Sequence, residues 1–166
     1  MATISTAGGH VARRGRFVQE HRHDSDKLPG KLAEPTVCPS CSAVYHKGRW
    51  SWSVPPAGAQ ETICPAYHRM KNKHPKGFLT LKGAVAPHQS EQMMGVIKNI
   101  AAKENKEHPL ARIMSIDKTP DGLIVLTTDS HLPKQIGGAL KQAYHGELVI
   151  HYNQGEDVAR VTWTHA

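Results

Sequence analysis

The chain has 166 residues, of which 39% are hydrophobic, and its 21 Lys and Arg outnumber its 14 Asp and Glu. This length allows one well-packed core and a small appended module, and it excludes two full-sized domains. No apolar run indicates an export signal or a membrane segment, so we expect a protein of the reducing cytoplasm.

The positive charge is concentrated in the amino-terminal half of the chain. Residues 1–82 contain 13 Lys and Arg against 5 Asp and Glu, whereas residues 83–166 contain 8 against 9. A soluble basic surface without a partner would spread its charge over both halves. The asymmetry therefore indicates a partner for the first half, and nucleic acid is a common partner of a small basic module.

Residues 1–34 contain few large apolar side chains and many Gly, Arg, His and Asp. We predict a basic arm that is disordered or becomes ordered on a partner. Its candidate phosphate contacts are Arg13, Arg14 and Arg16. A solvated tail of low complexity has the same composition, so the arm by itself does not prove a partner.

The three cysteines of the chain fall in two Cys-Pro knuckles between residues 35 and 76. Cys38-Pro-Ser-Cys41 is a complete CxxC pair, and Cys64-Pro-Ala-Tyr67-His68 follows about twenty residues later, at the spacing of a zinc ribbon. Tyr67 stands where a second CxxC pair would have its cysteine. Because zinc accepts thiolates and imidazoles together, we predict a Cys₃His site of Cys38, Cys41, Cys64 and His68.

Two other interpretations of the cysteines stay open. A CxxC pair is also a redox pair, although that use normally needs a strand-to-helix junction, and Pro39 leads here into a loop. The knuckles would also look like this in an empty relic whose hairpin survives by packing. A structural disulfide does not fit the odd cysteine count or the lack of an export signal.

The segment between the knuckles has the pattern of a small β-hairpin. Residues 44–46 and 50–52 alternate like short strands, with a Lys-Gly-Arg turn between them. A fold of about forty residues usually needs a metal or a disulfide. The candidate nucleic-acid contacts of this module are Arg49, Trp50, Trp52, Arg69, Lys71, Lys73 and Lys76. Packing of the small core is the competing use of the tryptophans.

From residue 77 the pattern changes to alternating strands and helices. Strands are expected at 78–85, 110–116, 123–128, 148–152 and 158–163, and helices at 87–108 and 130–145. Asp129 or Ser130 is expected to cap the second helix. The order β-α-β-β-α-β plus one strand predicts an α+β protein in which a ferredoxin-like domain (77–166) follows the zinc-ribbon-like module (35–76).

Several strings in the chain resemble one protein family. They are Cys38-Pro-Ser-Cys41, the Trp50 region, Cys64-Pro-Ala with His68-Arg69, His108-Pro-Leu-Ala-Arg-Ile-Met, Thr127-Thr-Asp-Ser-His-Leu and Ala143-Tyr-His-Gly-Glu-Leu. They resemble the bacterial low-oxygen-activated locus family, over roughly residues 10–166. That family is itself similar in outline to the nonsense-mediated decay protein 3 family of ribosomal export adaptors. Its usual pattern has a cysteine in place of Tyr67.

The charge pattern and the resemblance together favour a ribosome- or RNA-associated zinc-ribbon protein. The resemblance implies a role in low-oxygen stress or translational dormancy, with the ribosome, structured RNA or a ribosomal protein as partner. The alternative is a protein-interaction adaptor that uses the ribbon as a scaffold and docks through the sheet face of the second domain, in which acidic and basic residues nearly balance. Asp129-Ser130-His131 places three reactive side-chain types together, but helix capping explains the first two, so no enzyme is expected.

Overall fold

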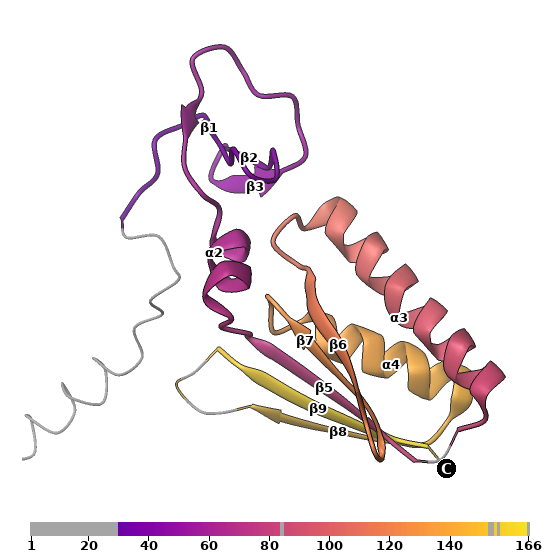
Figure 1. Cartoon of the computed structure of the whole chain (residues 1–166). Coiled ribbons are helices and arrows are strands. Elements are labelled where there is room, and N and C mark those ends of the chain that lie inside the picture. Colours follow the sequence, from indigo (N-terminus) through magenta and orange to yellow (C-terminus); the bar gives the residue numbers. More distant parts are fainter. Residues whose placement is uncertain (1–29, 84, 153–154, 156, 166) are drawn as a thin grey trace, which may run out of the picture.

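A computed structural model describes residues 30–83, 85–152, 155 and 157–165. They form a small module (residues 30–76), which contains a four-stranded sheet and one helix, and a large module (residues 77–165), which is an α+β sandwich (Figure 1). The predicted contacts Arg13, Arg14 and Arg16 lie outside the described residues. None of the described helices is long and apolar enough to cross a membrane.

The small sheet is built from strands of two or three residues. These are β1 (Thr36–Val37), β2 (Val44–His46), β3 (Arg49–Ser51) and β4 (Gln60–Glu61), in the order β3-β2-β1-β4. Lys47 and Gly48 connect β2 and β3 with φ values of 52° and 78°. Positive φ at both central residues is the geometry of the tight turn that matches the twist of a hairpin. The predicted hairpin is therefore confirmed.

A helix that the sequence analysis did not predict follows the second knuckle. It is α2 (Pro65–Asn72), which begins directly after Cys64 and ends at Lys73, a residue in the left-handed conformation with φ 56°. Proline suits the first helical position because that position needs no backbone N–H, and the Cys64 sulfur accepts the N–H of Tyr67 as a cap. The second knuckle is therefore a helix start rather than a loop.

The large module has the predicted element order. Its elements are β5 (Gly77–Lys82), α3 (Pro87–Glu107), β6 (Ile113–Thr119), β7 (Gly122–Thr127), α4 (Leu132–Tyr144), β8 (Glu147–Tyr152) and β9 (Ala159–Thr164). The strands are arranged as β6-β7-β5-β9-β8. Strand β9 is parallel to β5, and the other neighbouring pairs are antiparallel. Both long helices cover the same face of the sheet (Figure 1).

The main core lies between this face and the two helices. Alternate residues of the central strands are buried there, because successive side chains of a strand point to opposite faces. The buried core residues are Leu79, Leu81, Met93, Ile97, Leu123, Val125, Leu132, Ile136, Leu140, Val161 and Trp163. Trp163 is fully buried, and its indole N–H donates to the carbonyl of His145 at 2.7 Å. Among the described residues, no helix of the large module lies on the opposite face of the sheet.

Candidate metal centre and the seam between the modules

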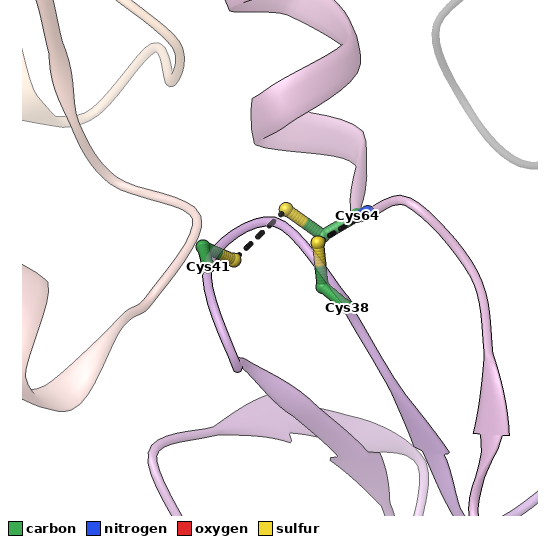
Figure 2. A group of neighbouring side chains, drawn as sticks. All are labelled: Cys38, Cys41 and Cys64. Carbon is green, nitrogen blue, oxygen red and sulfur yellow. Dashed lines mark hydrogen bonds between the residues drawn. The ribbon is translucent and has the colours of Figure 1, made fainter.

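Three cysteine sulfurs converge where the loop after β1 meets the start of α2 (Figure 2). The sulfurs of Cys38, Cys41 and Cys64 all lie within 4.8 Å of one another, and Cys41 and Cys64 are 3.7 Å apart. Cys38 and Cys64 are buried, and Cys41 is half-buried. Tetrahedral zinc with Zn–S bonds of about 2.3 Å requires sulfurs about 3.8 Å apart. The cluster can therefore hold a metal ion with small adjustments.

Backbone hydrogen bonds pin the two knuckles to each other. The N–H of Cys64 donates to the sulfur of Cys38 at 3.3 Å, and the N–H of Tyr67 donates to the sulfur of Cys64 at 3.4 Å. Ser42 closes the first knuckle by donating its N–H to the Cys38 carbonyl at 2.8 Å. Donors that point at sulfur favour the thiolate form, which is the form that binds a metal.

Burial and hydrogen bonding act in opposite directions on the buried thiols. Burial raises the pKa of Cys38, but the N–H groups of Cys64, Ser40 and Cys41 outweigh it and bring the pKa below its usual value. At Cys64 burial dominates over the Tyr67 N–H and raises the pKa to about 12. Without a metal ion, the cluster therefore keeps the Cys64 thiol protonated. A metal ion supplies the charge that removes this proton.

The predicted fourth ligand, His68, is not among the ligand atoms that the structure brings together. Its backbone N–H bonds to the carbonyl of Cys64, so His68 lies within α2, one residue beyond the position that an ideal knuckle would use. Tyr67 occupies that position and packs against the cysteine cluster. The Cys₃ part of the predicted site is assembled, and the imidazole is not part of it.

Arg112 of the large module reaches the sulfurs instead, and the sequence analysis missed it. Its Nη2 donates to Cys41 Sγ at 3.1 Å and lies 3.8 Å from Cys64 Sγ, while its Nε donates to the carbonyl of Pro109 at 2.7 Å. Arg112 can reach the sulfurs because β6 begins only at Ile113. Residues 110–112, which were predicted to belong to the strand, instead run along the small module. The guanidinium charge lowers the pKa of Cys64, although burial outweighs it.

The two tryptophans proposed as base contacts have structural partners. Trp50 is half-buried, packs against the cysteine cluster, and has its ring centre 5.5 Å from that of Tyr45. Trp52 is 42% exposed, donates its indole N–H to the Asn105 carbonyl at 2.6 Å, and lies under the Arg112 guanidinium. Trp50 therefore helps to form the small core, which is the competing use that the sequence left open, whereas Trp52 joins the two modules, a use that was not predicted.

Some of the predicted phosphate contacts of the small module are buried or paired within the protein, and the others are exposed. Arg69 is only 6% exposed, so it is not on the surface that a phosphate would reach, and this expectation is corrected. Lys76 donates to Asp157 at 3.1 Å. Arg49, Lys71 and Lys73 are exposed.

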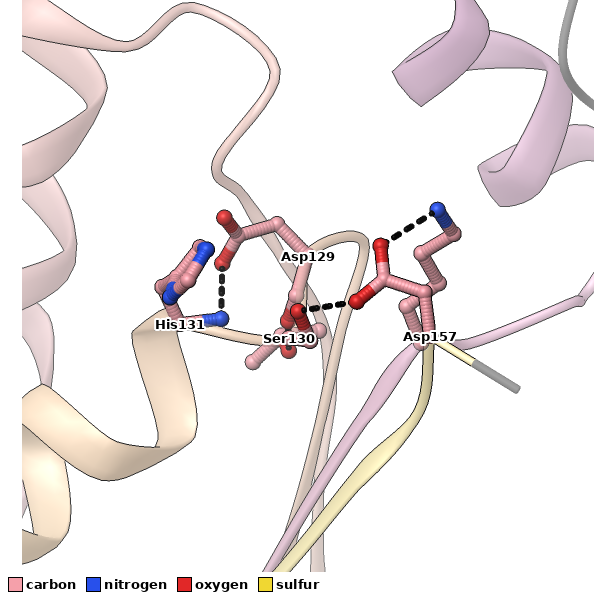
Figure 3. Close-up of polar contacts among 6 residues, drawn as sticks. Asp129, Ser130, His131 and Asp157 are labelled. Atoms are coloured by element: carbon pink, nitrogen blue, oxygen red, sulfur yellow. Dashed lines mark hydrogen bonds and ion pairs between the residues drawn. The ribbon is translucent and has the colours of Figure 1, made fainter. Parts of the chain in front are cut away.

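Asp129, Ser130 and His131 form a helix cap and a polar network (Figure 3). Asp129 Oδ1 accepts the N–H groups of His131 and Leu132 at 3.1 and 2.7 Å, so Asp129 satisfies donors at the start of α4, although the N-cap residue is His131 rather than Asp129 or Ser130. The Ser130 hydroxyl donates to Asp157 at 2.9 Å rather than to an imidazole. The hydrogen bond from Lys76 holds the pKa of Asp157 below its usual value, against the opposing effect of burial. Capping and ion pairing thus account for these polar groups.

Two cavities follow the seam between the modules. The first, of about 370 Å³, is lined by Arg49 and Trp50 of the small module and by His108, Asp129 and His131 of the large one, among others. The second, also of about 370 Å³, contains Arg69 and Lys76 and shares Leu110, Asp129 and His131 with the first. The seam is therefore hollowed next to the cysteine cluster, and its border carries cationic and imidazole side chains together with the carboxylates Glu104, Asp129 and Asp157.

No protein-family model, no curated protein and no solved structure matches the chain. The family resemblance noted from the motifs therefore stays a prediction.

Proposed function

We propose that the chain is a ribosome- or RNA-associated protein whose small module is held together by zinc. The observation that carries this proposal is the uneven charge, 13 Lys and Arg against 5 Asp and Glu in residues 1–82. In the described part of the small module, the exposed cations Arg49, Lys71 and Lys73 display this charge on the surface. Surface cations of this kind neutralise phosphates, and phosphate contacts supply most sequence-independent affinity for nucleic acid.

Zinc is the metal that best suits a buried cluster of thiols. Its role here is structural, because strands of two or three residues bury too little apolar surface to hold the module together. Cys38, Cys41 and Cys64 supply three ligands, and His68 is the proposed fourth if its ring turns toward the sulfurs. Following the family resemblance, the proposed setting is low-oxygen stress or translational dormancy in the cytoplasm.

We further infer that the large module is a variant of the ferredoxin-like arrangement. Strands β5 and β6 are parallel and are connected through α3, with β7 between them. Strands β7 and β8 are likewise parallel and are connected through α4, with β5 and β9 between them. Two interleaved βαβ units of this kind define the ferredoxin-like fold, and β9 is the added strand.

The seam offers a place for one nucleotide of a single strand. Trp50 provides an aromatic wall in the first cavity, and Arg49, His108 and His131 provide cationic or hydrogen-bonding groups around it. Recognition of RNA commonly stacks an unpaired base on an aromatic ring and binds the neighbouring phosphate with Arg or Lys. The proposal therefore places exposed phosphate contacts on Lys71 and Lys73 and one base at the seam.

Binding of a structured RNA, or of ribosomal subunits, across a salt series tests the proposal. Neutralising about four to six phosphates would lower the affinity by roughly two to three orders of magnitude between 50 and 200 mM salt. Changing Lys71 and Lys73 together to Ala should weaken binding and flatten this salt slope. The matched control changes Lys98 and Lys103, two exposed lysines of α3, to Ala. A binding constant that ignores salt, or equal losses in both double variants, would refute the RNA proposal.

A protein-interaction adaptor is the second candidate, favoured by the sheet face that no helix of the large module covers. This face carries Phe78 under the guanidinium of Arg160, at 4.3 Å, and Val149, which is 37% exposed. A protein docked there would bind with a shallow salt dependence, because few counterions would be released. Substituting Arg160 by Ala should then weaken binding more than the Lys71 and Lys73 change.

A further inference from the structure

Strand β8 is a free edge of the large sheet and has an unusually apolar surface. It is the last strand in the order β6-β7-β5-β9-β8, and Figure 1 shows no neighbouring strand beyond it. Val149, Ile150 and Tyr152 are 37%, 42% and 52% exposed, and they make up half of the exposed large hydrophobic residues found in the described part of the chain. An edge of this kind is a template for pairing with another strand.

The opposite edge of the same sheet is protected against pairing with another strand, so the exposed edge at β8 is not a general property of this sheet. Strand β6 has an irregular register between Ile113 and Ser115, and it carries the exposed charges Asp117 and Lys118. Bulges and edge lysines are the usual devices that prevent a strand from pairing. Strand β8 (Glu-Leu-Val-Ile-His-Tyr) has no lysine, no proline and an uninterrupted register with β9. Of the two edges that the described strands give the large sheet, the β8 edge is therefore the one open to a new strand.

The register of β8 limits how a second copy can pair with it. Leu148 lies opposite Trp163, which is buried under the helices, so Leu148, Ile150 and Tyr152 belong to the helix-covered face. The side chains of Glu147, Val149 and His151 therefore belong to the other face. An antiparallel partner that continues the sheet must match these faces, which means that odd-numbered residues pair with odd-numbered residues.

Two registers satisfy this condition over five of the six residues, with the two-fold axis at Val149 or at Ile150, and only the first brings Glu147 opposite His151. With Val149 opposite the second copy's Val149, Glu147 comes opposite His151 of the second copy, and the reciprocal pair forms by symmetry. Leu148 then meets Ile150 of the second copy on the other face. Opposite-charge and apolar pairs directly across an antiparallel ladder are favourable. Glu147 and His151 are the only ionisable side chains of β8 apart from Tyr152, so this register pairs a carboxylate acceptor with an imidazole donor and apolar residues with one another.

We propose that β8 pairs antiparallel with β8 of a second copy of this chain, about a two-fold axis at Val149. The pairing joins two five-stranded sheets into one continuous sheet with all long helices on the same side. Each copy contributes one six-residue strand to the contact. This contact is small, so the dimer forms in a concentration-dependent way. The proposal does not depend on RNA or metal binding.

Sedimentation velocity of the full-length chain, from about 1 to about 100 μM, measures this equilibrium directly. The wild type should shift from monomer to dimer with rising concentration. V149K places two lysines opposite each other at the two-fold axis and should weaken association by about tenfold or more. The matched control is V54K, which also adds a lysine at an exposed valine (88% exposed) but outside every strand, and it should associate like the wild type. A monomer at every concentration, or equal weakening by both variants, overturns the proposal.

A charge exchange tests the antiparallel register. E147K places a lysine opposite His151 of the second copy, and H151E places two glutamates opposite each other, so each change should weaken association. The double variant E147K/H151E restores opposite charges across the axis and should recover most of the wild-type association. Additive weakening in the double variant would overturn the register.

Cysteine cross-linking tests the position of the axis. In an antiparallel ladder, directly opposed Cα atoms are about 4.5 or 5.5 Å apart, which a disulfide can bridge. V149C should therefore cross-link to the second copy's V149C under mild oxidation. I150C is the control, because two residues of offset place its counterpart about 8 Å away, beyond the range of a disulfide. The wild type measures the background from the three native cysteines. Cross-linking of I150C in preference to V149C overturns the proposed axis.

Discussion

Replacing Arg112 by Met should weaken zinc binding while leaving the core of the large module folded. The Arg112 guanidinium donates to Cys41 Sγ at 3.1 Å and lies 3.8 Å from Cys64 Sγ. On metal binding these sulfurs carry negative charge, so the contact becomes a charge-assisted hydrogen bond. Such a bond contributes about 1.5–3 kcal/mol, which corresponds to roughly a 10- to 100-fold change in affinity. Methionine keeps much of the apolar volume but has neither the charge nor the donors.

Competition with a chromophoric chelator at constant pH measures the affinity of each variant. Arg160→Met is the matched control, because Arg160 stacks on Phe78 of the helix-free sheet face rather than on a cysteine. Arg112→Lys should fall between the wild type and Arg112→Met, since it keeps the charge but not the planar fork. Far-ultraviolet circular dichroism during urea unfolding reports whether the large module stays folded, because the near-ultraviolet signal would also change at Trp52, which lies under the Arg112 guanidinium. Unchanged zinc affinity in folded Arg112→Met would refute the assigned role.

Three further predictions concern the large core, an ion pair and the thiols. Gly137→Ala should lower the free energy of unfolding, measured by urea titration, by about 1–3 kcal/mol, because the new Cβ would lie 2.8 Å from Leu148 Cδ1. The control is Gly138→Ala, which should be neutral or stabilising because a Cβ at this neighbouring position has open space. Because the pKa of Asp157 is lowered in the folded state, its carboxylate stabilises the fold above the usual carboxyl pKa and loses this effect as the pH falls through the folded value. The Asp157 side chain is 70% exposed, so Asp157→Asn should lower the free energy of unfolding by less than about 1 kcal/mol at pH 7 and should have no effect in strong acid. Zinc affinity should rise with pH, because Cys64, with its pKa near 12, must release a proton on binding; an affinity that does not change between pH 6 and about 8 would contradict this.

The sequence by itself determined the parts of the protein that depend on neighbours along the chain. The order of strands and helices from residue 77 follows from local periodicity, since period 2 and period 3.6 distinguish the elements without knowledge of their partners. The hairpin at Lys47-Gly48 follows from turn chemistry. The approach of Cys38, Cys41 and Cys64 follows from knuckle spacing.

The helix α2 shows where local signals were present but were overlooked. Pro65 directly after Cys64 is a helix-start signal, because proline suits the first helical position. The knuckle spacing instead pointed to His68 as the fourth ligand, with no helix after Cys64. The cap formed by the Cys64 sulfur depends on its buried position, which no sequence rule provides.

Only the tertiary structure decided which distant groups meet. Periodicity reports that one face of a strand is buried but not which strand lies beside it, so the insertion of β9 between β5 and β8 was not predictable from the pattern. The contact of Arg112 with Cys41 joins residues 71 positions apart, and the burial of Arg69 depends on how the two modules pack. Charge and residue type were visible in the sequence, but whether an arginine faces solvent, a sulfur or a core depends on contacts that form only when the whole chain has folded.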